Sequence, residues 1–217
     1  MKIKNIFTKE RIRQHLTDST AIILESTPIF AALETCLVGM SSNVSMNARL
    51  CAAGLGYAGL GFVYGKGRDV WRKMLRVTQE SKERYQAFSD LTYPIVFNSI
   101  AGPLVYYFSG ARNLKEIVWG TGAGIVLGAA NGWFIGYAID TFRDLTGFKE
   151  CTRSSYPAIV KRQSQKIKAG LAALLVAGSL GLTSELYSIN NSKQLKEQPI
   201  QVERMSETKD ITTYLNN

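Results

Sequence analysis

The stretch WGTGAGIVLGAANGWFIGY, residues 119–137, decides the fold. Five of its six glycines fall at a strict spacing of four, and these are Gly120, Gly124, Gly128, Gly132 and Gly136. In an α-helix this spacing places them on one slowly drifting stripe. Inside a water-exposed helix each glycine would cost about 0.8 to 1.0 kcal/mol relative to alanine. In lipid, small residues instead let two helices approach closely, so the stretch predicts a transmembrane helix with a close-packing face.

Apolar segments of similar length recur on both sides of this stretch. A bilayer core of about 30 Å is crossed by about 20 apolar residues. We therefore expect an all-α membrane protein with spanning helices at 19–40, 48–64, 91–110, 117–139 and 169–189. The chain then divides into a cytoplasmic amphipathic lead-in (1–17), a four-helix core (18–145), a basic cytoplasmic linker (146–168), a fifth transmembrane helix (169–189) and a polar tail (190–217).

The net charge of +9 is distributed unevenly along the chain. Of the Lys and Arg residues, 19 lie before the first expected span or in the loops after the second and fourth, against 7 on the other side. The positive-inside rule then places the amino terminus in the cytoplasm and the carboxyl terminus outside the inner (plasma) membrane. A nucleic-acid-binding patch would not alternate with long apolar segments, so we exclude nucleic acid as a partner.

Residues that could carry chemistry or hold a cofactor are scattered. Cys36, Cys51 and Cys151 have no metal or redox spacing and are expected to be free thiols. His15 is the single histidine, and no nucleotide-binding loop or nucleophile motif occurs. The sequence therefore predicts no catalytic residues, no cofactor and no metal site, and the protein is not expected to be an enzyme.

Two glutamates lie inside the first expected span, Glu25 and Glu34, with Pro28 between them. A charged residue at the bilayer centre costs about 2.5 to 3.5 kcal/mol on the insertion scale, so both should face the bundle or an aqueous cavity. Asp18 shares a helical face with Glu25, whereas Glu34 points roughly opposite. Pro28 removes one backbone hydrogen bond, frees a carbonyl and predicts a kink.

The first and second pairs of helices look like copies of one unit. Asp18 and Asp69 are 51 positions apart, and Asp90 and Asp140 are 50 apart. Each half has an aspartate, a proline-bearing helix, an outer loop, a glycine-bearing helix and a charged exit. We interpret the halves as two parallel two-helix repeats related by an axis along the membrane normal. Coincidence among residues common in membranes is the alternative.

Several short motifs follow one another in a fixed order between Asp18 and Leu145. They are Leu37-Val38-Gly39-Met40-Ser41, Ala48-Arg49-Leu50, Tyr64-Gly65-x-x-Arg68-Asp69, Ser89-Asp90 and Gly128-x-x-x-Gly132-Trp133-Phe134. As an ordered set they resemble the bacterial L-alanine exporter family. The resemblance implies a small four-helix inner-membrane protein that exports alanine on an ion gradient, with a small amino acid and the lipid bilayer as partners. The chain departs from the family in its fifth segment, in the position of Pro103 and in having Gly136 where the family has an acidic residue.

Carried over by position, the resemblance implies functional roles for Glu34, Arg49, Arg68, Asp69 and Asp90, to which Glu25 is added as a buried acid. A zwitterionic amino acid needs a cation for its carboxylate and an acid for its ammonium group, and Arg49 and Glu34 could supply these. Asp90 is a candidate for proton coupling or gating. Alternatively, Asp18 and Asp90 are helix N-caps, and Arg68 with Asp69 only fixes the depth of a helix.

The glycine stripe has two interpretations. It packs the fourth span against the second within one chain, or it forms a homo-oligomer, and a second small-residue stripe follows at Ala169, Ala173, Ala177 and Gly181. Two functions remain open. One is export of L-alanine or a similar small neutral amino acid by alternating access, coupled to an ion gradient. The other is a non-transporting oligomeric scaffold or pore-like protein. The tail is expected to be flexible or a short surface helix.

Overall fold

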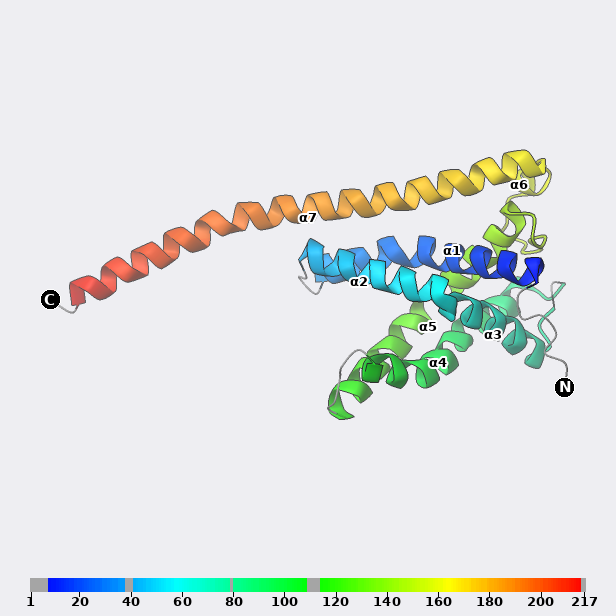
Figure 1. Cartoon of the computed structure of the whole chain (residues 1–217), viewed down its shortest axis with the longest axis horizontal. Helices are drawn as coiled ribbons and strands as arrows, with labels where there is room; N and C mark the ends of the chain where they lie inside the picture. The colour runs from blue at the N-terminus through cyan, green and yellow to red at the C-terminus, as the bar shows by residue number, and fades with distance from the viewer. Residues whose placement is uncertain (1–7, 38–40, 79, 109–113, 216–217) are drawn as a thin grey trace.

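The computed structural model describes residues 8–37, 41–78, 80–108 and 114–215. Its regular elements in these ranges are all helical, which confirms the all-α prediction. They are α1 (Lys9–Ala32), α2 (Ser42–Leu55), α3 (Gly61–Met74), α4 (Glu83–Phe108), α5 (Leu114–Leu145), α6 (Ala158–Lys161) and α7 (Gln165–Leu215), with π-helical turns η1 (Leu33–Leu37) and η2 (Gly56–Leu60) (Figure 1).

The helices form two antiparallel hairpins that converge at one end and diverge at the other (Figure 1). Hairpin one is α1 with the run α2–η2–α3, and hairpin two is α4 with α5. The long helix α7 lies along α1 (Figure 1). We call the convergent end, where α3 finishes and α4 begins, the cluster end, and the opposite end the far end.

Helix α1 begins nine residues before Asp18, at Lys9. Thr8 caps it, because its hydroxyl accepts a hydrogen bond from the Arg11 amide at 3.4 Å. Helix α4 likewise begins at Glu83, well before Asp90. Both aspartates are therefore fully buried inside helices, and the interpretation of either as an N-cap is wrong.

The second expected span is the continuous helical run α2–η2–α3, which bends at Gly59. Gly59 has φ = +133° and ψ = −18°, a conformation that only glycine adopts without strain. The run extends from Ser42 to Met74, beyond the expected 48–64 on both sides, because a π-turn absorbs the bend and the helix continues.

Gly59→Ala is expected to lower the free energy of unfolding by about 1 to 3 kcal/mol, the cost of holding a side chain at this backbone conformation. Gly54→Ala is the matched control. A Cβ at either glycine has no described atom within 4 Å, so neither change creates a clash. Thermal unfolding of the purified protein in detergent measures the difference, and equal effects of the two substitutions would contradict the prediction.

The glycine stripe of α5 packs against α4. A Cβ added at Gly128 would lie 2.2 Å from the Asn98 side-chain nitrogen, and one at Gly132 would lie 2.3 Å from the carbonyl oxygen of Asp90. At Gly128, Gly132 and Gly136 the stripe therefore faces its neighbour within hairpin two, and the interpretation that it packs against the second span is wrong for these glycines. The surroundings of Gly120 and Gly124 lie outside the described side chains.

Pro94 explains this choice of partner. It has no backbone N–H, so the carbonyl of Asp90, four residues earlier, loses its helical partner. A glycine on the facing helix can approach such a carbonyl closely and offer it Cα–H contacts. Gly132 occupies that place, with its absent Cβ position also 2.7 Å from the Pro94 ring.

Helix α7 is 51 residues long and includes most of the expected tail. The backbone of 190–215 is helical and continuous with the segment before it, so the tail is not a separate short helix, and it extends beyond the other helices in Figure 1. Lys168, Ala172 and Thr183 lie on its buried face. The second small-residue stripe (Ala169, Ala173, Ala177 and Gly181) is exposed.

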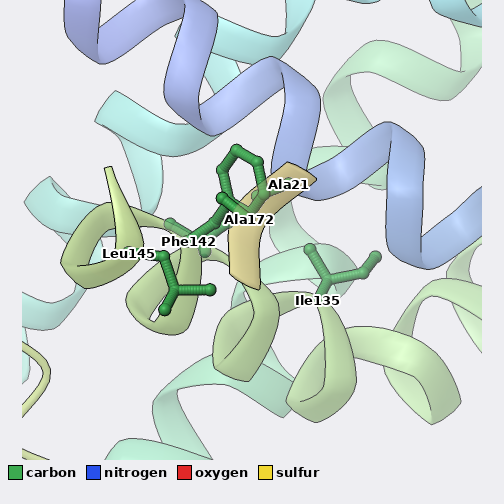
Figure 2. Packing of buried hydrophobic residues seen from close by; sticks show 6 residues of the cluster. Ala21, Ile135, Phe142, Leu145 and Ala172 are labelled. Atoms are coloured by element: carbon green, nitrogen blue, oxygen red, sulfur yellow. The ribbon is translucent and has the colours of Figure 1, made fainter. Parts of the chain in front are cut away.

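A small apolar core joins three helices near the cluster end. Ala21 of α1, Phe142 and Leu145 of α5, and Ala172 of α7 meet there, with Ile135 alongside (Figure 2). Elsewhere in the described residues, more buried side chains are polar or charged than apolar, while large apolar side chains such as those of residues 50, 100, 126 and 174 are more than 60% exposed. This distribution is typical of helices whose outer surfaces face lipid.

One described stretch, Gln165–Ser192 of α7, is long and apolar enough to cross a membrane, with a mean hydropathy of 1.5. It includes the fifth expected span. The crossing of the bilayer by helices of the two hairpins stays a prediction.

Candidate functional site

Eight charged side chains gather at the cluster end, and we call them the ion-pair cluster. They are Asp18, Asp69, Asp90, Asp140, Arg68, Arg72, Arg143 and Arg153. The carboxylates of Asp18 and Asp90 are completely buried, and the side chains of Arg68, Arg143 and Arg153 are at most 2% exposed. Buried charges of this kind require partners, and here four of each sign are paired.

Arg143 of α5 binds two carboxylates of hairpin one. Its Nε and Nη2 donate to the two oxygens of Asp18 at 2.7 and 2.6 Å. Its Nη1 and Nη2 donate to the two oxygens of Asp69 at 2.8 and 3.0 Å. Gln14 adds longer hydrogen bonds of 3.4 and 3.3 Å to the same two aspartates. One guanidinium thus ties α5 to both α1 and α3.

Arg72 of α3 repeats this geometry in the opposite direction. Its Nε and Nη2 donate to Asp90 at 3.2 and 2.8 Å, and its Nη1 and Nη2 donate to Asp140 at 3.4 and 3.1 Å. The same atoms play the same roles as in Arg143. Through these two equivalent arginines each hairpin binds two aspartates of the other, which is the arrangement expected for a repeated two-helix unit.

A spacing shared by the two halves underlies the crossed pairs. Gly61, Gly65, Asp69 and Arg72 recur 71 residues later as Gly132, Gly136, Asp140 and Arg143. The second glycine of each set makes room for a buried aspartate: a Cβ at Gly65 would lie 2.3 Å from Asp18 Oδ2, and one at Gly136 would lie 2.2 Å from Asp90 Oδ2. Sequence reasoning missed the arginines at 72 and 143, although this spacing was the signal for both.

The two halves of the cluster differ in charge. Arg68 also binds Asp90 and Asp140, at 2.8 and 2.9 Å, while Ile139 stands at the equivalent place in the second unit. Arg153, from the segment after α5, donates to Asp140 Oδ2 at 2.8 Å and to Asp90 Oδ2. Within the described chain, the pair of aspartates around Arg143 has one arginine and the other pair has three.

Electrostatics keep Asp90 and Asp140 ionised at neutral pH. Burial alone would raise the pKa values of Asp90 and Asp140, but Arg68 and Arg72 lower both below the ordinary value. Burial would lower the pKa of Arg68, and the two aspartates outweigh it and raise that pKa. The pairs of Asp90 and Asp140 with Arg68 are therefore true ion pairs with charge-assisted hydrogen bonds.

The thermal unfolding midpoint is expected to be insensitive to these aspartates from about pH 8 to about pH 5 and to fall below about pH 4. Carboxylates with lowered pKa values in the folded state stabilise it above their ordinary pKa of 3.8, and this contribution is lost as the pH falls through the lowered values. Asp90→Asn should show a shallower acid loss than the unchanged protein. A main loss of stability near neutral pH, absent from Asp90→Asn, would contradict this protonation state.

A second polar site lies at the far end. Arg49 of α2 binds Glu34 of η1 at 2.5 Å, and the Ser45 hydroxyl donates to the other oxygen of Glu34 at 2.6 Å. The Arg49 guanidinium lies 4.9 Å from the centre of the Phe30 ring. Its Nε is buried and has no hydrogen-bond partner among the described residues. Sixteen residues of helix separate Glu34 from Asp18, about 24 Å at 1.5 Å per residue.

A cavity of about 580 Å³ lies between the hairpins. Its lining includes Glu34, Arg49, Tyr64, Asn98 and Gly128, contributed by both hairpins. Of the described residues, those of the ion-pair cluster are not in this lining, so the cluster lies outside the cavity. The cavity combines an apolar wall with one acid and one base, which suits a small zwitterion.

The family model for L-alanine exporters (AlaE) matches residues 7–149 of the chain. The chain belongs to the L-alanine exporter family. This confirms the family resemblance and makes the chain a membrane transport protein with a small amino acid as the class of substrate. The match includes both hairpins and the cluster apart from Arg153, while α6 and α7 lie beyond it. Searches of curated proteins and of solved structures found no match.

The six site residues predicted from the sequence occupy three places. Glu34 and Arg49 pair beside the cavity, and Arg68, Asp69 and Asp90 belong to the ion-pair cluster. Glu25 lies apart from both groups. It lines a second cavity of about 530 Å³ between α1, α5 and α7, where Asn131 donates to its Oε2 at 3.1 Å. The described chain leaves its other, buried carboxylate oxygen without a partner.

Proposed function

We propose that this protein exports L-alanine, or a similar small neutral amino acid, by alternating access of its two hairpins, driven by an ion gradient. The observation that carries the proposal is the Glu34–Arg49 pair in a cavity between hairpins that are fastened together at the cluster end. Asp90 and Glu25 are the candidate coupling residues. Export of this kind needs one substrate site and two alternative closures, and the arrangement supports both requirements.

Substrate binding proceeds by exchange of partners at the far end. The substrate carboxylate takes the Arg49 guanidinium, whose buried Nε offers a donor that no described group uses. The substrate ammonium group takes Glu34. One internal ion pair is thereby replaced by two charge-assisted contacts with the zwitterion. The planar guanidinium held over Phe30 fixes the direction of approach.

The ion-pair cluster forms the closed gate. Its pairs through Arg68, Arg72 and Arg143 all cross from one hairpin to the other. The positive-inside rule places the cluster end in the cytoplasm, so this form faces outward. Opening toward the cytoplasm requires the crossed pairs to separate. Bound substrate shifts the protein toward this inward-facing form only if Glu34 and Arg49 bind it more tightly when the far end is closed than when it is open.

The scaffold alternative rests on a glycine stripe that is free to assemble copies of the chain. Gly128, Gly132 and Gly136 instead contact α4 within the chain. A homo-oligomer, which we retain in the proposal, would use another surface, such as the exposed stripe of α7.

L-alanine counterflow in proteoliposomes tests the proposal. We expect saturable exchange by the unchanged protein, and loss of exchange in Arg49→Gln, Glu34→Gln and Asp90→Asn. Arg84→Lys is the control, because Arg84 is exposed and contacts Tyr85 beside it in sequence. Alaninamide, which lacks the carboxylate, and propionate, which lacks the ammonium group, should compete poorly. Folded protein that exchanges no amino acid would overturn the exporter proposal.

A further inference from the structure

We propose that the segment beyond the family match, residues 150–192, is a positioning arm of the transport unit. Arg153, Ser179 and Tyr187 hold groups of the core at the cluster end, at mid-helix and at the far end. The inference rests on the proposed function, because it assigns residues to the gate and to the substrate site of that exporter. The arm lies outside residues 7–149, so the match to the family model does not cover these residues.

At the cluster end, Arg153 completes the gate. It binds Asp90 and Asp140, both of hairpin two, at the Oδ2 atoms that Arg68 and Arg72 of α3 also bind. The Arg153 guanidinium also lies 5.3 Å from the centre of the Tyr137 ring, and Lys161 donates to the Arg153 carbonyl at 3.1 Å. Among the described residues Arg153 makes no ion pair with hairpin one. It holds the two carboxylates in the positions where Arg68 and Arg72 of α3 bind them, and it supports the closure of the cluster end in this way.

At mid-helix, Ser179 of α7 contacts α1 where Pro28 interrupts its backbone hydrogen bonding. Pro28 has no N–H, so the carbonyl of Leu24, four residues earlier, has no helical donor. The Ser179 hydroxyl donates to that carbonyl at 2.7 Å. The carbonyl freed by Pro28 is thus satisfied by a residue of the arm.

At the far end, Tyr187 of α7 orients the acid of the substrate site. Its hydroxyl lies 3.1 Å from the Ser45 hydroxyl, which donates its single hydrogen to Glu34. Tyr187 is therefore the donor to Ser45, and it holds the Ser45 hydroxyl in the direction of Glu34. Ser42 also donates to the Tyr187 carbonyl at 3.4 Å, which holds α7 against the start of α2.

These contacts predict two different kinetic effects. Tyr187→Phe removes one hydroxyl and should raise the half-saturating L-alanine concentration on the order of tenfold, with the maximal rate little changed. Arg153→Gln weakens the closure at the cluster end. It should therefore lower the half-saturating concentration on the cluster-end face and raise it on the far-end face, each on the order of tenfold. A purely structural role would impair both faces alike.

The experiment measures sided L-alanine exchange in proteoliposomes and L-alanine-induced thermal stabilisation in detergent. Thr183→Val is the control for Tyr187→Phe, because the one bond of the Thr183 hydroxyl to a described residue is within α7, to the Ser179 carbonyl at 2.8 Å. Arg162→Gln, at an exposed site, is the control for Arg153→Gln, and Arg153→Lys tests whether charge alone suffices. Absence of exchange by the unchanged protein would reject the exporter. Two outcomes would overturn the positioning arm and leave the exporter proposal standing. One is exchange that does not differ between the Arg153 and Tyr187 variants and their controls, and the other is exchange that is reduced equally on both faces.

Discussion

Gly136→Ala is expected to abolish L-alanine exchange, whereas Gly122→Ala in the same helix is expected to preserve it. A Cβ at Gly136 would lie 2.2 Å from Asp90 Oδ2 and 2.3 Å from its Cγ, and Asp90 is held in place by three arginines. The clash should cost about 1 to 3 kcal/mol or more, because the carboxylate can move only by breaking ion pairs. A Cβ at Gly122 meets no described atom within 4 Å and gains up to about 1 kcal/mol of helix propensity.

The equivalent glycine of the first unit, Gly65, allows the same test on the other half of the cluster. A Cβ at Gly65 would lie 2.3 Å from Asp18 Oδ2, so Gly65→Ala should have the same effect, with Gly54→Ala as its control. Counterflow and thermal unfolding measure both pairs of variants. Normal exchange by a folded Gly136→Ala protein would show that Asp90 does not need its position in the cluster.

Arg143→Gln is expected to destabilise the protein by about 3 to 5 kcal/mol, and Arg72→Gln by clearly less, despite their equivalent geometry. Removing Arg143 leaves the carboxylates of Asp18 and Asp69 with no other ion-pair partner among the described residues. Removing Arg72 leaves the carboxylates around it bound to Arg68 and Arg153. The penalty is that of an uncompensated buried charge, which arises only in the first case.

A double variant shows whether this buried charge is the cause. Asp18→Asn in the Arg143→Gln background removes the stranded carboxylate, so the combined loss should be smaller than the sum of the single losses. Denaturation in mixed micelles gives the three free energies, and Arg162→Gln serves as the exposed control. Losses of unfolding free energy that add up in the double variant, or that are equal for Arg143→Gln and Arg72→Gln, would show that a stranded buried carboxylate does not cause the larger effect of Arg143→Gln.

Helix beginnings show where sequence reasoning failed. An aspartate in front of an apolar run looks like an N-cap, and this is one of the two interpretations that the sequence allows for Asp18 and Asp90. Helix α1 instead begins after its N-cap Thr8, with Glu10 in the first turn. The polar residues that follow Glu10 look like a surface segment, which hides this beginning in the sequence. What the local pattern could not show is that a buried arginine about 125 positions away in the chain makes a polar helical face stable.

The glycine stripe was recognised, but its partner was not. Spacing shows that a backbone can approach, and it carries no information about which helix does so. Pro94 makes α4 the partner helix, because it leaves the Asp90 carbonyl without its helical donor and a glycine of α5 can approach that carbonyl. A pattern confined to α5 does not reveal this. The arginines were missed for a related reason. Arg143 was counted only as a basic loop residue, whereas its alignment with Arg72 becomes visible once the halves are compared at a fixed offset.

The division of the ion-pair cluster between the moving parts has an electrical consequence. Hairpin one carries Asp18, Asp69, Arg68 and Arg72, and hairpin two with its following segment carries Asp90, Asp140, Arg143 and Arg153. Each set has two negative and two positive charges. One uncompensated charge moving through 100 mV would change the energy by about 2.3 kcal/mol. Because each set is neutral, the separation of the two sets moves no net cluster charge through the membrane voltage. A voltage dependence of transport is therefore expected to come from charges outside the cluster, such as the driving ion.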